Sequence, residues 1–405
     1  MNWIDTTVGE FCPFIYGKGL PKTKRQAGEY PVYGSNGCVD FHNDFYINGP
    51  GIIIGRKGSV GAVHLSTQPF WPIDTAFYVT KATLGELRFT YYLLKSLGLE
   101  KMNSDSAVPG LNRDNAHALS IRIPESPESR ESLGNQMALL DEKIAANSGV
   151  NQTLEEMAQA IFKSWFVDFD PVKAKMNGEQ PEGIDAATAS LFPEKLDSET
   201  GLPVGWNQGV IADIAKLNSK SWTKKNQPEQ VHYVDLANTK NGVIETVTTY
   251  DFDEAPSRAR RVLNSGDTIV GTVRPGNRSF AFIGETEQPL TGSTGFAVLS
   301  PKEEFWTSFV YLATTNDDSI DEYARLADGG AYPAIKPVVV ADTPCVIPTT
   351  DIAQKFWQLT GAMLQKAHQN RLENEELAKL RDTLLPKLLS GEIELGQDQE
   401  LAEVE

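Results

Sequence analysis

Two stretches of the chain place apolar residues in alternating steps of four and three, the spacing of a helix that packs along one seam. Positions 133, 137, 140, 144, 147, 151, 154, 158, 161 and 165 read Leu, Met, Leu, Ile, Asn, Asn, Leu, Ala, Ile and Trp. Positions 352, 356, 359, 363, 366, 370, 373, 377, 380 and 384 read Ile, Phe, Leu, Met, Lys, Asn, Glu, Leu, Leu and Leu. The pattern predicts two long helices, over residues 126–166 and 350–390. Ser126 suits the first N-cap, and Pro171 bars continuation of that helix.

The two seams match each other, so they predict an antiparallel pair within one chain. The seam from 133 to 165 spans about 48 Å at a rise of about 1.5 Å per residue. Asn151 and Asn370 hold equivalent seam positions. Two explanations stay open for these polar residues: the pair is loose at its middle and tolerates them, or they fix register and orientation.

Short runs of β-branched and aromatic residues, cut by Gly, Pro and Asn, precede each long helix and predict strands. Examples are "GIIIGRKG" (51–58), "TAFYVT" (75–80), "DTIVGTVRPG" (267–276) and "TGFAVLSP" (294–301). A shorter helix is predicted near residues 86–97. The hairpin-like stretch "YPVYGSNG" (30–37) ends in a tight turn, in which Gly34 and Gly37 can adopt positive φ.

Four landmarks recur in the same order in the two halves of the chain. "NGPGIIIG" (48–55) matches "NSGDTIVG" (264–271), "IDTAFYV" (73–79) matches "GSTGFAV" (292–298), "SAVPGL" (106–111) matches "GAYPAI" (330–335), and "RIP" (122–124) matches "VIP" (346–348). "YPVYGSNG" has a weaker echo in "YVDLANTKNG" (233–242). Order kept over several landmarks indicates a tandem duplication.

The predicted fold class is therefore α+β, with two repeated globular domains separated by an antiparallel coiled coil of two long helices. The predicted segments are a first domain (1–124), a first long helix (125–170), a Pro/Gly-rich acidic connector (171–205), a second domain (206–348), a second long helix (349–395) and an acidic tail (396–405). A chain of 405 residues has room for two or three such cores.

The net charge of −17 argues at first against a polyanionic ligand. Its distribution weakens that argument, because residues 1–123 carry 12 Lys and Arg against 10 Asp and Glu. No apolar run approaches the ~20 residues of a membrane helix, and nothing resembles a signal peptide. Three scattered cysteines fit no disulfide framework or zinc site, so we expect a reducing cytoplasm.

Motifs of common catalytic sites are not found. The chain has no phosphate-binding "GxxxxGK[ST]" loop, and its histidines never pair at i, i+4. "GRKGSVG" (55–61) reads as a tight hairpin rather than a dinucleotide fingerprint. The paired carboxylates Asp168 and Asp170 read as a solvated helix end. We therefore expect neither an enzyme nor a metal site.

What remains is a binder with two heads, whose turns carry cationic and hydrogen-bonding residues suited to phosphates and base edges. A plain surface role stays open for each residue alone, and for the first turn a role in closing the sheet, with Tyr30 and Tyr33 in the core. The candidates in the first head are Tyr33, Ser35, Asn36, Arg56, Lys57 and Ser59. Those in the second head are Lys224, Lys225, Asn238, Lys240, Arg258, Arg260, Arg261, Arg274, Asn277 and Arg278.

Four aromatic residues near the end of the first long helix exceed what one seam can bury. The cluster comprises Phe162, Trp165, Phe166 and Phe169. It predicts a contact with a partner protein, and packing on the adjacent domain stays open as the alternative.

The chain resembles the specificity subunits of type I restriction–modification enzymes. The resemblance rests on "YPVYGSNG", on "GSVGAV" (58–63), on "DTAFYV" (74–79), on "SAVPGLNR" (106–113), on "IFKSWFVDFDPVKAK" (161–175) and on "LLPKLLSGEIEL" (384–395). These motifs extend over nearly the whole chain. The second head departs from the pattern, with "ANTKNG" in place of "YGSNG".

The resemblance implies two target-recognition domains that read double-stranded DNA, one half-site each, in a subunit without catalysis. It also implies assembly with two methylation subunits and with restriction subunits. Those partners would bind S-adenosylmethionine, ATP and Mg, while this subunit would hold no cofactor. The alternative is a non-catalytic coiled-coil adaptor with two heads that bind peptides or proteins.

Overall fold

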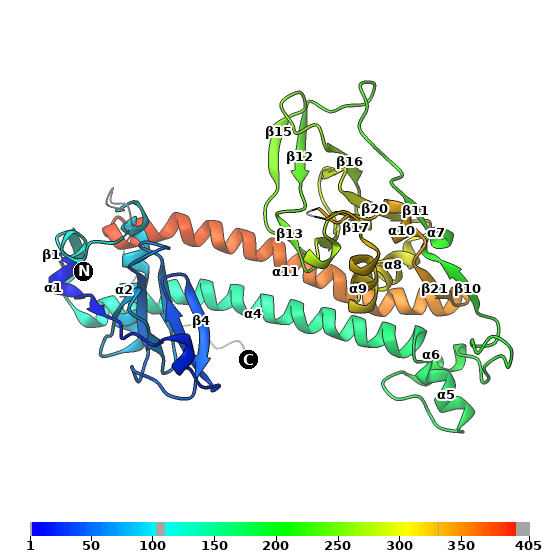
Figure 1. Ribbon diagram of the computed structural model, residues 1–405, viewed down its shortest axis with the longest axis horizontal. Coiled ribbons are helices and arrows are strands. Elements are labelled where there is room, and N and C mark those ends of the chain that lie inside the picture. Colours follow the sequence, from blue (N-terminus) through cyan, green and yellow to red (C-terminus); the bar gives the residue numbers. More distant parts are fainter. Residues whose placement is uncertain (1, 103–109, 331, 394–405) are drawn as a thin grey trace. The chain divides into compact units, whose positions relative to one another are not determined.

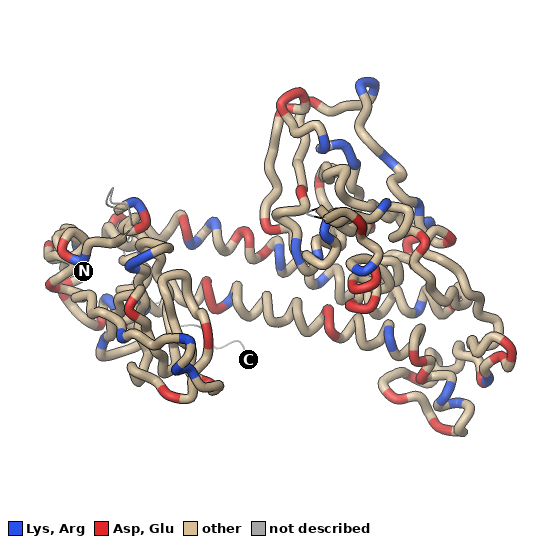
Figure 2. The backbone as a smooth tube through the Cα atoms, viewed as in Figure 1, with Lys and Arg blue, Asp and Glu red and all other residues tan. Residues whose placement is uncertain are grey.

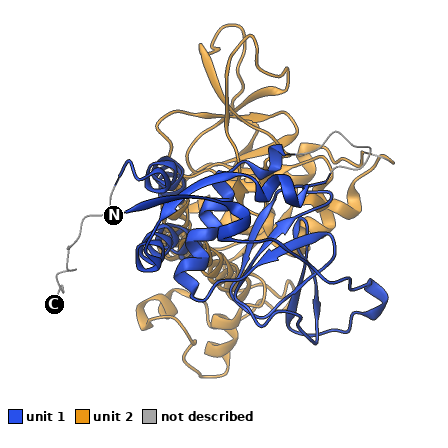
Figure 3. Cartoon of the chain, turned by 90° about the vertical axis from the view of Figure 1, so that its left-hand side faces the viewer, with its two compact units in different colours: residues 1–146, 373–405 blue, residues 147–372 orange. Residues whose placement is uncertain are grey.

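The computed structural model describes residues 2–102, 110–330 and 332–393. The chain divides into two compact units, unit 1 with residues 1–146 and 373–405, and unit 2 with residues 147–372 (Figure 3). Two long helices, α4 (Pro127–Phe166) and α11 (Thr350–Ser390), contribute residues to both units. Each unit mixes helices with sheets, which confirms the α+β class and both long helices (Figure 1). The domain boundaries drawn from the sequence stay predictions, and the tail at 396–405 lies outside the described residues.

The described part of unit 1 contains three sheets. A four-stranded sheet has the order β2-β8-β5-β6, a three-stranded sheet has the order β4-β3-β7, and β1 pairs with β9. In the three-stranded sheet, β3 runs antiparallel to β4 and parallel to β7. The strands are β1 (Trp3–Thr7), β2 (Ile15–Tyr16), β3 (Tyr30–Gly34), β4 (Gly37–His42), β5 (Gly51–Gly55), β6 (Val63–Ser66), β7 (Trp71–Pro72), β8 (Ala76–Val79) and β9 (Ser120–Pro124). The short helices are α1 (Val8–Phe11), η1 (Lys22–Lys24), α2 (Leu84–Ser96), η2 (Leu99–Lys101) and α3 (Arg113–His117).

Unit 2 repeats this topology. Its sheets have the orders β11-β20-β17-β18 and β15-β12-β19-β16, and β10 pairs with β21. Strand β12 again has one antiparallel neighbour, β15, and one parallel neighbour, β19. The strands are β10 (Asn207–Val210), β11 (Ala215–Leu217), β12 (Gln230–Val234), β13 (Thr239–Lys240), β14 (Val243–Ile244), β15 (Thr248–Asp251), β16 (Ala259–Leu263), β17 (Thr268–Gly271), β18 (Phe280–Phe282), β19 (Leu290–Ser293), β20 (Phe296–Pro301) and β21 (Pro344–Ile347). The shared strand order supports the duplication read from the sequence, with β16 and the small β13–β14 ribbon added in unit 2.

The helices of unit 2 follow the same plan. Helix α8 stands where unit 1 has α2, between the last strand of the four-stranded sheet and the final paired strand. The remaining helices are α5 (Asp170–Met176), α6 (Ala186–Leu191), α7 (Ile211–Ile214), η3 (Pro275–Asn277), η4 (Glu304–Trp306), α8 (Thr307–Thr315), α9 (Asp317–Leu326) and α10 (Pro337–Ala341). Helices α5 and α6 lie in the connector, whose Val172 and Phe192 pack in the core of unit 2.

The seam predicted for the first long helix is confirmed. All ten positions from 133 to 165 are buried or half-buried. The N-cap is also confirmed, because the Ser126 Oγ accepts a hydrogen bond from the Ser129 amide at 3.2 Å. The helix ends at Phe166, before Pro171, as expected.

The seam predicted for the second long helix is wrong at four of its ten positions. Positions 359, 366, 373 and 380 are exposed, whereas the positions one residue later, 360, 367, 374 and 381, are buried or half-buried. The residues at these later positions are Thr360, Ala367, Asn374 and Arg381, which are small or polar. Because Leu359 and Leu380 are apolar, the sequence pattern placed the seam one residue too early at these positions.

Within unit 1, α4 and α11 run in opposite directions. Asp141 accepts a hydrogen bond from Arg381 at 2.6 Å, and the Asn374 side chain donates to the Ile144 carbonyl at 3.3 Å. Tyr92 of α2 donates to the same Asp141 carboxylate at 2.6 Å, which ties the globular part of the unit to both long helices. Burial is the main reason that the pKa of Tyr92 lies above its ordinary value.

Within unit 2 the same two helices are again antiparallel. The Asn370 amide donates to the Asn151 side-chain oxygen at 2.8 Å, and both residues are buried. Further along, Phe162 and Phe166 pack against Phe356. Tyr311 of α8 donates to Glu155 of α4 at 2.7 Å, the counterpart of the Tyr92 bond in unit 1.

The Asn151–Asn370 bond predicts a strongly non-additive pair of substitutions. Asn370→Ala leaves a buried amide unpaired and should lower the free energy of unfolding by about 1–3 kcal/mol. Asn151→Leu combined with Asn370→Leu should recover most of that loss, because an apolar pair leaves no amide unsatisfied. Urea unfolding of Asn151→Leu, Asn370→Leu and the double leucine variant measures the coupling, and additive losses in this cycle would show that the two amides do not interact.

Candidate nucleic-acid interface

The turn between β3 and β4 contains one buried residue, Ser35, and one exposed residue, Asn36. Ser35 is buried, and its hydroxyl donates to the Thr75 carbonyl at 2.5 Å and accepts from the Lys57 amide at 3.3 Å. Asn36 is exposed and accepts a hydrogen bond from the Ser59 hydroxyl at 3.2 Å. Of the two glycines expected at positive φ, Gly37 has it (97°) and Gly34 does not. Ser35 therefore holds the turn in place, while Asn36 faces solvent.

Tyr33, the other candidate in this hairpin, is half-buried. Its ring packs edge-on against Phe70, with the ring centroids 5.9 Å apart. Beside it, burial lowers the pKa of His64, whose ring lies against Gly37. These contacts correspond to the sheet-closing role that the sequence left open for Tyr33.

Two arginines, Arg56 in the loop after β5 and Arg113 at the start of α3, lie around an exposed tyrosine. The Arg56 guanidinium lies 4.9 Å from the ring centroid of Tyr16 and donates to the Asp74 carbonyl at 3.1 Å. The Arg113 guanidinium lies 5.1 Å from the centroid of the same ring. Tyr16 itself is 46% exposed. Lys57, next in the loop, is exposed. Sequence reasoning missed Tyr16 and Arg113, although Arg113 closes the "SAVPGLNR" motif.

A third segment completes this surface. The Leu111 amide donates to the Arg56 carbonyl at 2.9 Å, and Lys57 forms a β-bridge with Gly110. The Arg56 amide in turn donates to the Thr75 carbonyl at 2.9 Å. We call residues 34–37, 55–61 and 110–113 loop surface 1. Residues 106–109 of the "SAVPGLNR" motif lie outside the described residues.

Unit 2 builds the same frame from other residues. The Ile335 amide donates to the Thr272 carbonyl at 2.9 Å, the Thr272 amide donates to the Gly295 carbonyl at 2.8 Å, and Val273 bridges Ala334. These three contacts are the counterparts of those made by Leu111, Arg56 and Lys57. We call residues 235–242, 271–279 and 332–335 loop surface 2. The loop after β17 also contacts the first segment, because the Ser279 hydroxyl donates to the Leu236 carbonyl at 3.0 Å.

Five predicted residues lie on loop surface 2. Lys240 and Asn277 are exposed, and the Asn238 amide donates to Asp235 at 2.9 Å. Arg278 donates to the Asn241 side chain at 2.9 Å and forms an ion pair with Asp317 at 2.7 Å. The fifth is Arg274, which is exposed and lies 4.7 Å from the ring centroid of Tyr332.

Three more predicted residues of unit 2 lie in or next to β16, which has no named counterpart in unit 1. Arg258 donates to the Tyr233 hydroxyl at 3.1 Å, and Arg260 lies 4.8 Å from the Phe252 ring centroid. Arg261 donates to the Ser221 hydroxyl at 3.2 Å, and burial lowers its pKa. Arg261 therefore has a packing role.

Lys224 and Lys225 are exposed on a turn between β11 and β12. The turn is closed by Asn226, which accepts hydrogen bonds from both the amide and the hydroxyl of Thr223. Figure 2 shows Lys and Arg interspersed with Asp and Glu along the described parts of both units. The candidate cations therefore lie among acidic residues.

The aromatic cluster is part of the core of unit 2. Phe162, Trp165 and Phe166 are each at most 6% exposed, and Phe169 is half-buried against Trp206. Phe309 and Phe356 supply further rings to the same core. The packing alternative accounts for these contacts, because a partner protein cannot reach rings that are already enclosed. We do not propose partner contacts for the three buried rings.

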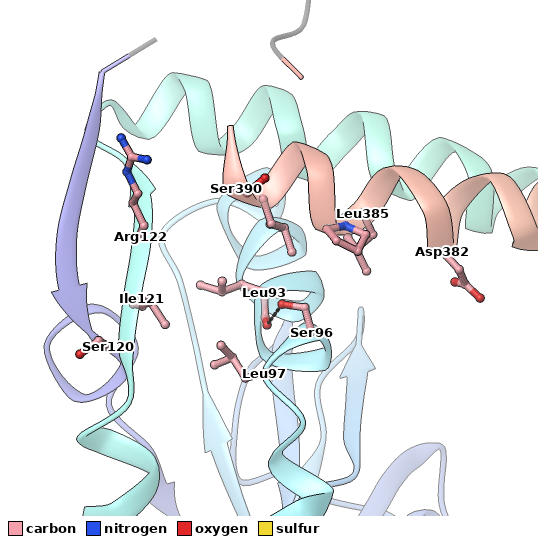
Figure 4. A pocket seen from close by; sticks show the side chains of 11 residues that line it. Leu93, Ser96, Leu97, Ser120, Ile121, Arg122, Asp382, Leu385 and Ser390 are labelled. Atoms are coloured by element: carbon pink, nitrogen blue, oxygen red, sulfur yellow. Dashed lines mark hydrogen bonds between the residues drawn. The ribbon is translucent and has the colours of Figure 1, made fainter. Parts of the chain in front are cut away.

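A cavity of unit 1 lies outside loop surface 1. It is lined by the end of α2, by β9 and by the last turns of α11, with Leu93, Leu97 and Leu385 among its residues (Figure 4). None of the candidate residues lines it. Among the described residues, no cluster of His, Cys, Asp and Glu could hold a metal ion, and no helix is long and apolar enough to cross a bilayer.

Comparisons with known proteins agree with this architecture. Residues 1–156 match the family described as the type I restriction modification DNA specificity domain. The chain is 26% identical to the type I restriction enzyme HindI specificity subunit of Haemophilus influenzae, over 70% of this chain and 71% of that protein. The resemblance to the type I specificity subunits is confirmed.

Two further type I specificity subunits are similar along most of the chain. The MjaIX specificity subunit of Methanocaldococcus jannaschii is 24% identical over 85% of this chain and 78% of its own length. The crystal structure of the type I S subunit from M. genitalium superposes with a TM-score of 0.62 at 17% identity, and covers 96% of both chains. That likeness shows a shared fold over nearly the whole chain.

Substitutions of Ser35 and Asn36 should distinguish a structural role in the turn from a role in binding. Ser35→Ala removes a buried hydroxyl that has two partners, so we expect a loss of about 1–2 kcal/mol in the free energy of unfolding. Asn36→Ala, at the exposed neighbour, is the matched control and should change stability by less than about 0.5 kcal/mol. Denaturant unfolding with hydrogen exchange at residues 55–61 measures both effects. Equal stabilities for the two variants would contradict the assigned role of Ser35.

Proposed function

We propose that this chain is the DNA sequence-recognition subunit of a type I restriction–modification complex, and that it reads an asymmetric bipartite target with one half-site per unit. The observation that carries the proposal is the pair of loop surfaces. Both have the same backbone frame, and they display different side chains on it. A common frame suits one kind of ligand, and different side chains suit different base sequences.

The chemistry of the loop surfaces fits DNA. Asn36 and Lys57 on loop surface 1 are exposed, as are Lys240, Arg274 and Asn277 on loop surface 2. Cations contact phosphates, while arginine and asparagine side chains can form paired hydrogen bonds with guanine and adenine. The net charge of −17 limits the phosphate contacts that the lone chain can make. Basic surfaces of partner subunits would therefore supply much of the affinity.

The long helices suit the role of a spacer. Readers of the major groove on one face of a duplex sit about one turn apart, roughly 34–36 Å, so we expect half-site centres about 10 bp apart. Unread base pairs would separate the two half-sites.

The proposed partners follow from the family. Two methylation subunits would bind S-adenosylmethionine, and restriction subunits would use ATP and Mg. In this scheme the chain selects the target and scaffolds the other subunits, and it catalyses no step itself. The TM-score of 0.62 with an S subunit supports this role at the level of the fold.

Substitutions confined to one loop surface should alter one half of the recognised target. The first variant combines Asn36→Ala with Lys57→Ala, and the second combines Lys240→Ala with Asn277→Ala. Loss of a base contact should reduce discrimination between base pairs at that position of the target by about 1–3 kcal/mol. Loss of a phosphate contact should weaken binding to all DNA sequences to the same extent. Methylome sequencing of a host that carries the complete system, with each variant in turn, gives the motif.

Lys216→Ala, in β11 and outside loop surface 2, is the matched control for loss of one exposed lysine. The proposal requires each double variant to change its own half-site and leave the other intact. A change of both half-sites by either variant would refute the division of labour. Unchanged motifs and unchanged DNA binding for both variants would favour the adaptor alternative instead.

A further inference from the structure

Three residues of unit 1 that are far apart in the sequence gather two positive charges on one aromatic ring. The Arg56 guanidinium lies 4.9 Å from the ring centroid of Tyr16, and the Arg113 guanidinium lies 5.1 Å from it. Two like charges beside one ring repel each other, which raises the free energy of the folded chain. The ring offsets only part of this cost through its attraction for cations.

Contacts within unit 1 hold Arg56 in this place. Its guanidinium donates to the Asp74 carbonyl at 3.1 Å and lies 5.9 Å from the ring centroid of Phe77. Phe77 is fully buried and pairs with Tyr16 across β8 and β2, with their ring centroids 5.0 Å apart. The sheet therefore positions both the ring and the guanidinium, so this charge stays close to the surface of the unit.

Arg113 reaches the same ring from another segment. It is the first residue of α3, and the bond from the Leu111 amide to the Arg56 carbonyl fixes the residues just before it. The Arg113 side chain is 39% exposed, and its Nε atom is buried without a hydrogen-bond partner in the part of the chain that the structure describes. The Asp114 carboxylate lies 3.5 Å from that Nε atom and is 85% exposed. One solvated carboxylate leaves the pair of guanidinium groups with a net positive charge.

Unit 2 has neutral residues at the equivalent positions. Thr272 takes the place of Arg56, because the two make matching backbone hydrogen bonds in the two loop surfaces. Pro337 is the counterpart of Arg113, since each begins a helix of five residues two positions after the amide that bonds to that carbonyl. Strand β11, which stands where unit 1 has β2, contains no aromatic residue. The fold therefore does not require the two arginines, and their presence in unit 1 indicates a role in binding.

We infer that Arg56 and Arg113, positioned by Tyr16, bind a phosphate group of the DNA backbone at the half-site recognised by unit 1, an inference that rests on the proposed function. Arginine can donate two parallel hydrogen bonds to phosphate, and the full charge of the anion relieves the repulsion between the two cations. A base edge carries no net charge, and the O6 and N7 atoms of one guanine are matched by a single guanidinium. A side chain held close to the protein surface, like that of Arg56, also reaches the outside of a duplex more readily than the floor of a groove. Tyr16 acts here as a positioning residue.

The test measures DNA binding by the complete methylation complex at a series of salt concentrations. Arg113→Gln should reduce the slope of log affinity against log salt by about 0.9, the value for one phosphate contact, and leave the recognised motif unchanged. Arg113→Lys keeps the charge, so it should retain the slope. Tyr16→Phe keeps the ring and should bind like the unchanged protein, whereas Tyr16→Ala should weaken binding to all sequences by about 2- to 5-fold.

Neutral methylphosphonates, placed one at a time in the half-site of unit 1, locate the contact. The unchanged complex should lose affinity at one or two positions, and Arg113→Gln should be insensitive to the replacement at one of them. Insensitivity of the unchanged complex at every position would overturn the inference without any substitution in the protein. Arg122→Gln is the matched control, because Arg122 is an exposed arginine outside loop surface 1 that also lies near a ring, 5.9 Å from the Trp3 centroid. An equal loss of slope in this control would show a general effect of charge and contradict the inference.

An unchanged salt slope for Arg56→Gln combined with Arg113→Gln would also overturn the inference. So would loss of discrimination at one base pair in Arg113→Lys, which would make Arg113 a reader of bases. Loss of assembly with the methylation subunits would assign the two arginines to a protein partner instead. The proposed function survives each of these results if Lys240→Ala with Asn277→Ala still alters its own half-site. Binding without sequence preference by the unchanged complex would refute the proposed function itself.

Discussion

Antiparallel packing of α4 against α11 is the constraint on which each unit depends. In unit 2 a buried hydrogen bond between Asn151 and Asn370 fixes the register of the two helices. In unit 1 the ion pair of Asp141 with Arg381 lies at the same interface. One tyrosine per unit, Tyr92 or Tyr311, joins a short helix of the globular part to a carboxylate of α4. A shift of α11 along α4 would break the Asn151–Asn370 and Asp141–Arg381 contacts together, because each joins one position of α4 to one position of α11.

The duplication explains how one backbone frame can present two different sets of exposed side chains. Backbone hydrogen bonds from Arg56 and Leu111 in unit 1, and from Thr272 and Ile335 in unit 2, hold three segments together in the same way. Backbone contacts place few demands on the side chains, so the exposed positions were free to diverge. The exchange of Gly58 for Arg274 at one left-handed position shows this freedom most clearly. The frame supplies position, and the exposed side chains would supply the sequence read.

Features that depend on the periodicity of apolar residues could be predicted from the sequence. Features that depend on contacts between segments far apart in the chain could not. All ten seam positions of α4 were predicted correctly, because each is apolar or is an asparagine in step with the apolar residues. The seam of α11 was misplaced at four positions, because Thr360 and Ala367 are buried while Leu359 is exposed. Tyr16 and Tyr332 were missed, since nothing local distinguishes an exposed aromatic that stacks under an arginine from a core residue. Ser35 was assigned to DNA from its turn, and only the bonds to Thr75 and Lys57 show its structural role.

The most direct test of the account lengthens both long helices by one heptad, between residues 146 and 147 of α4 and between residues 372 and 373 of α11. Seven residues add about 10 Å of helix, close to 3 bp of duplex. Methylome sequencing of a host that carries the altered system would then give the recognised motif. If the long helices set the distance between the half-sites, both half-sites stay unchanged and the unread spacer between them becomes longer. Altered half-sites with an unchanged spacer would contradict this account.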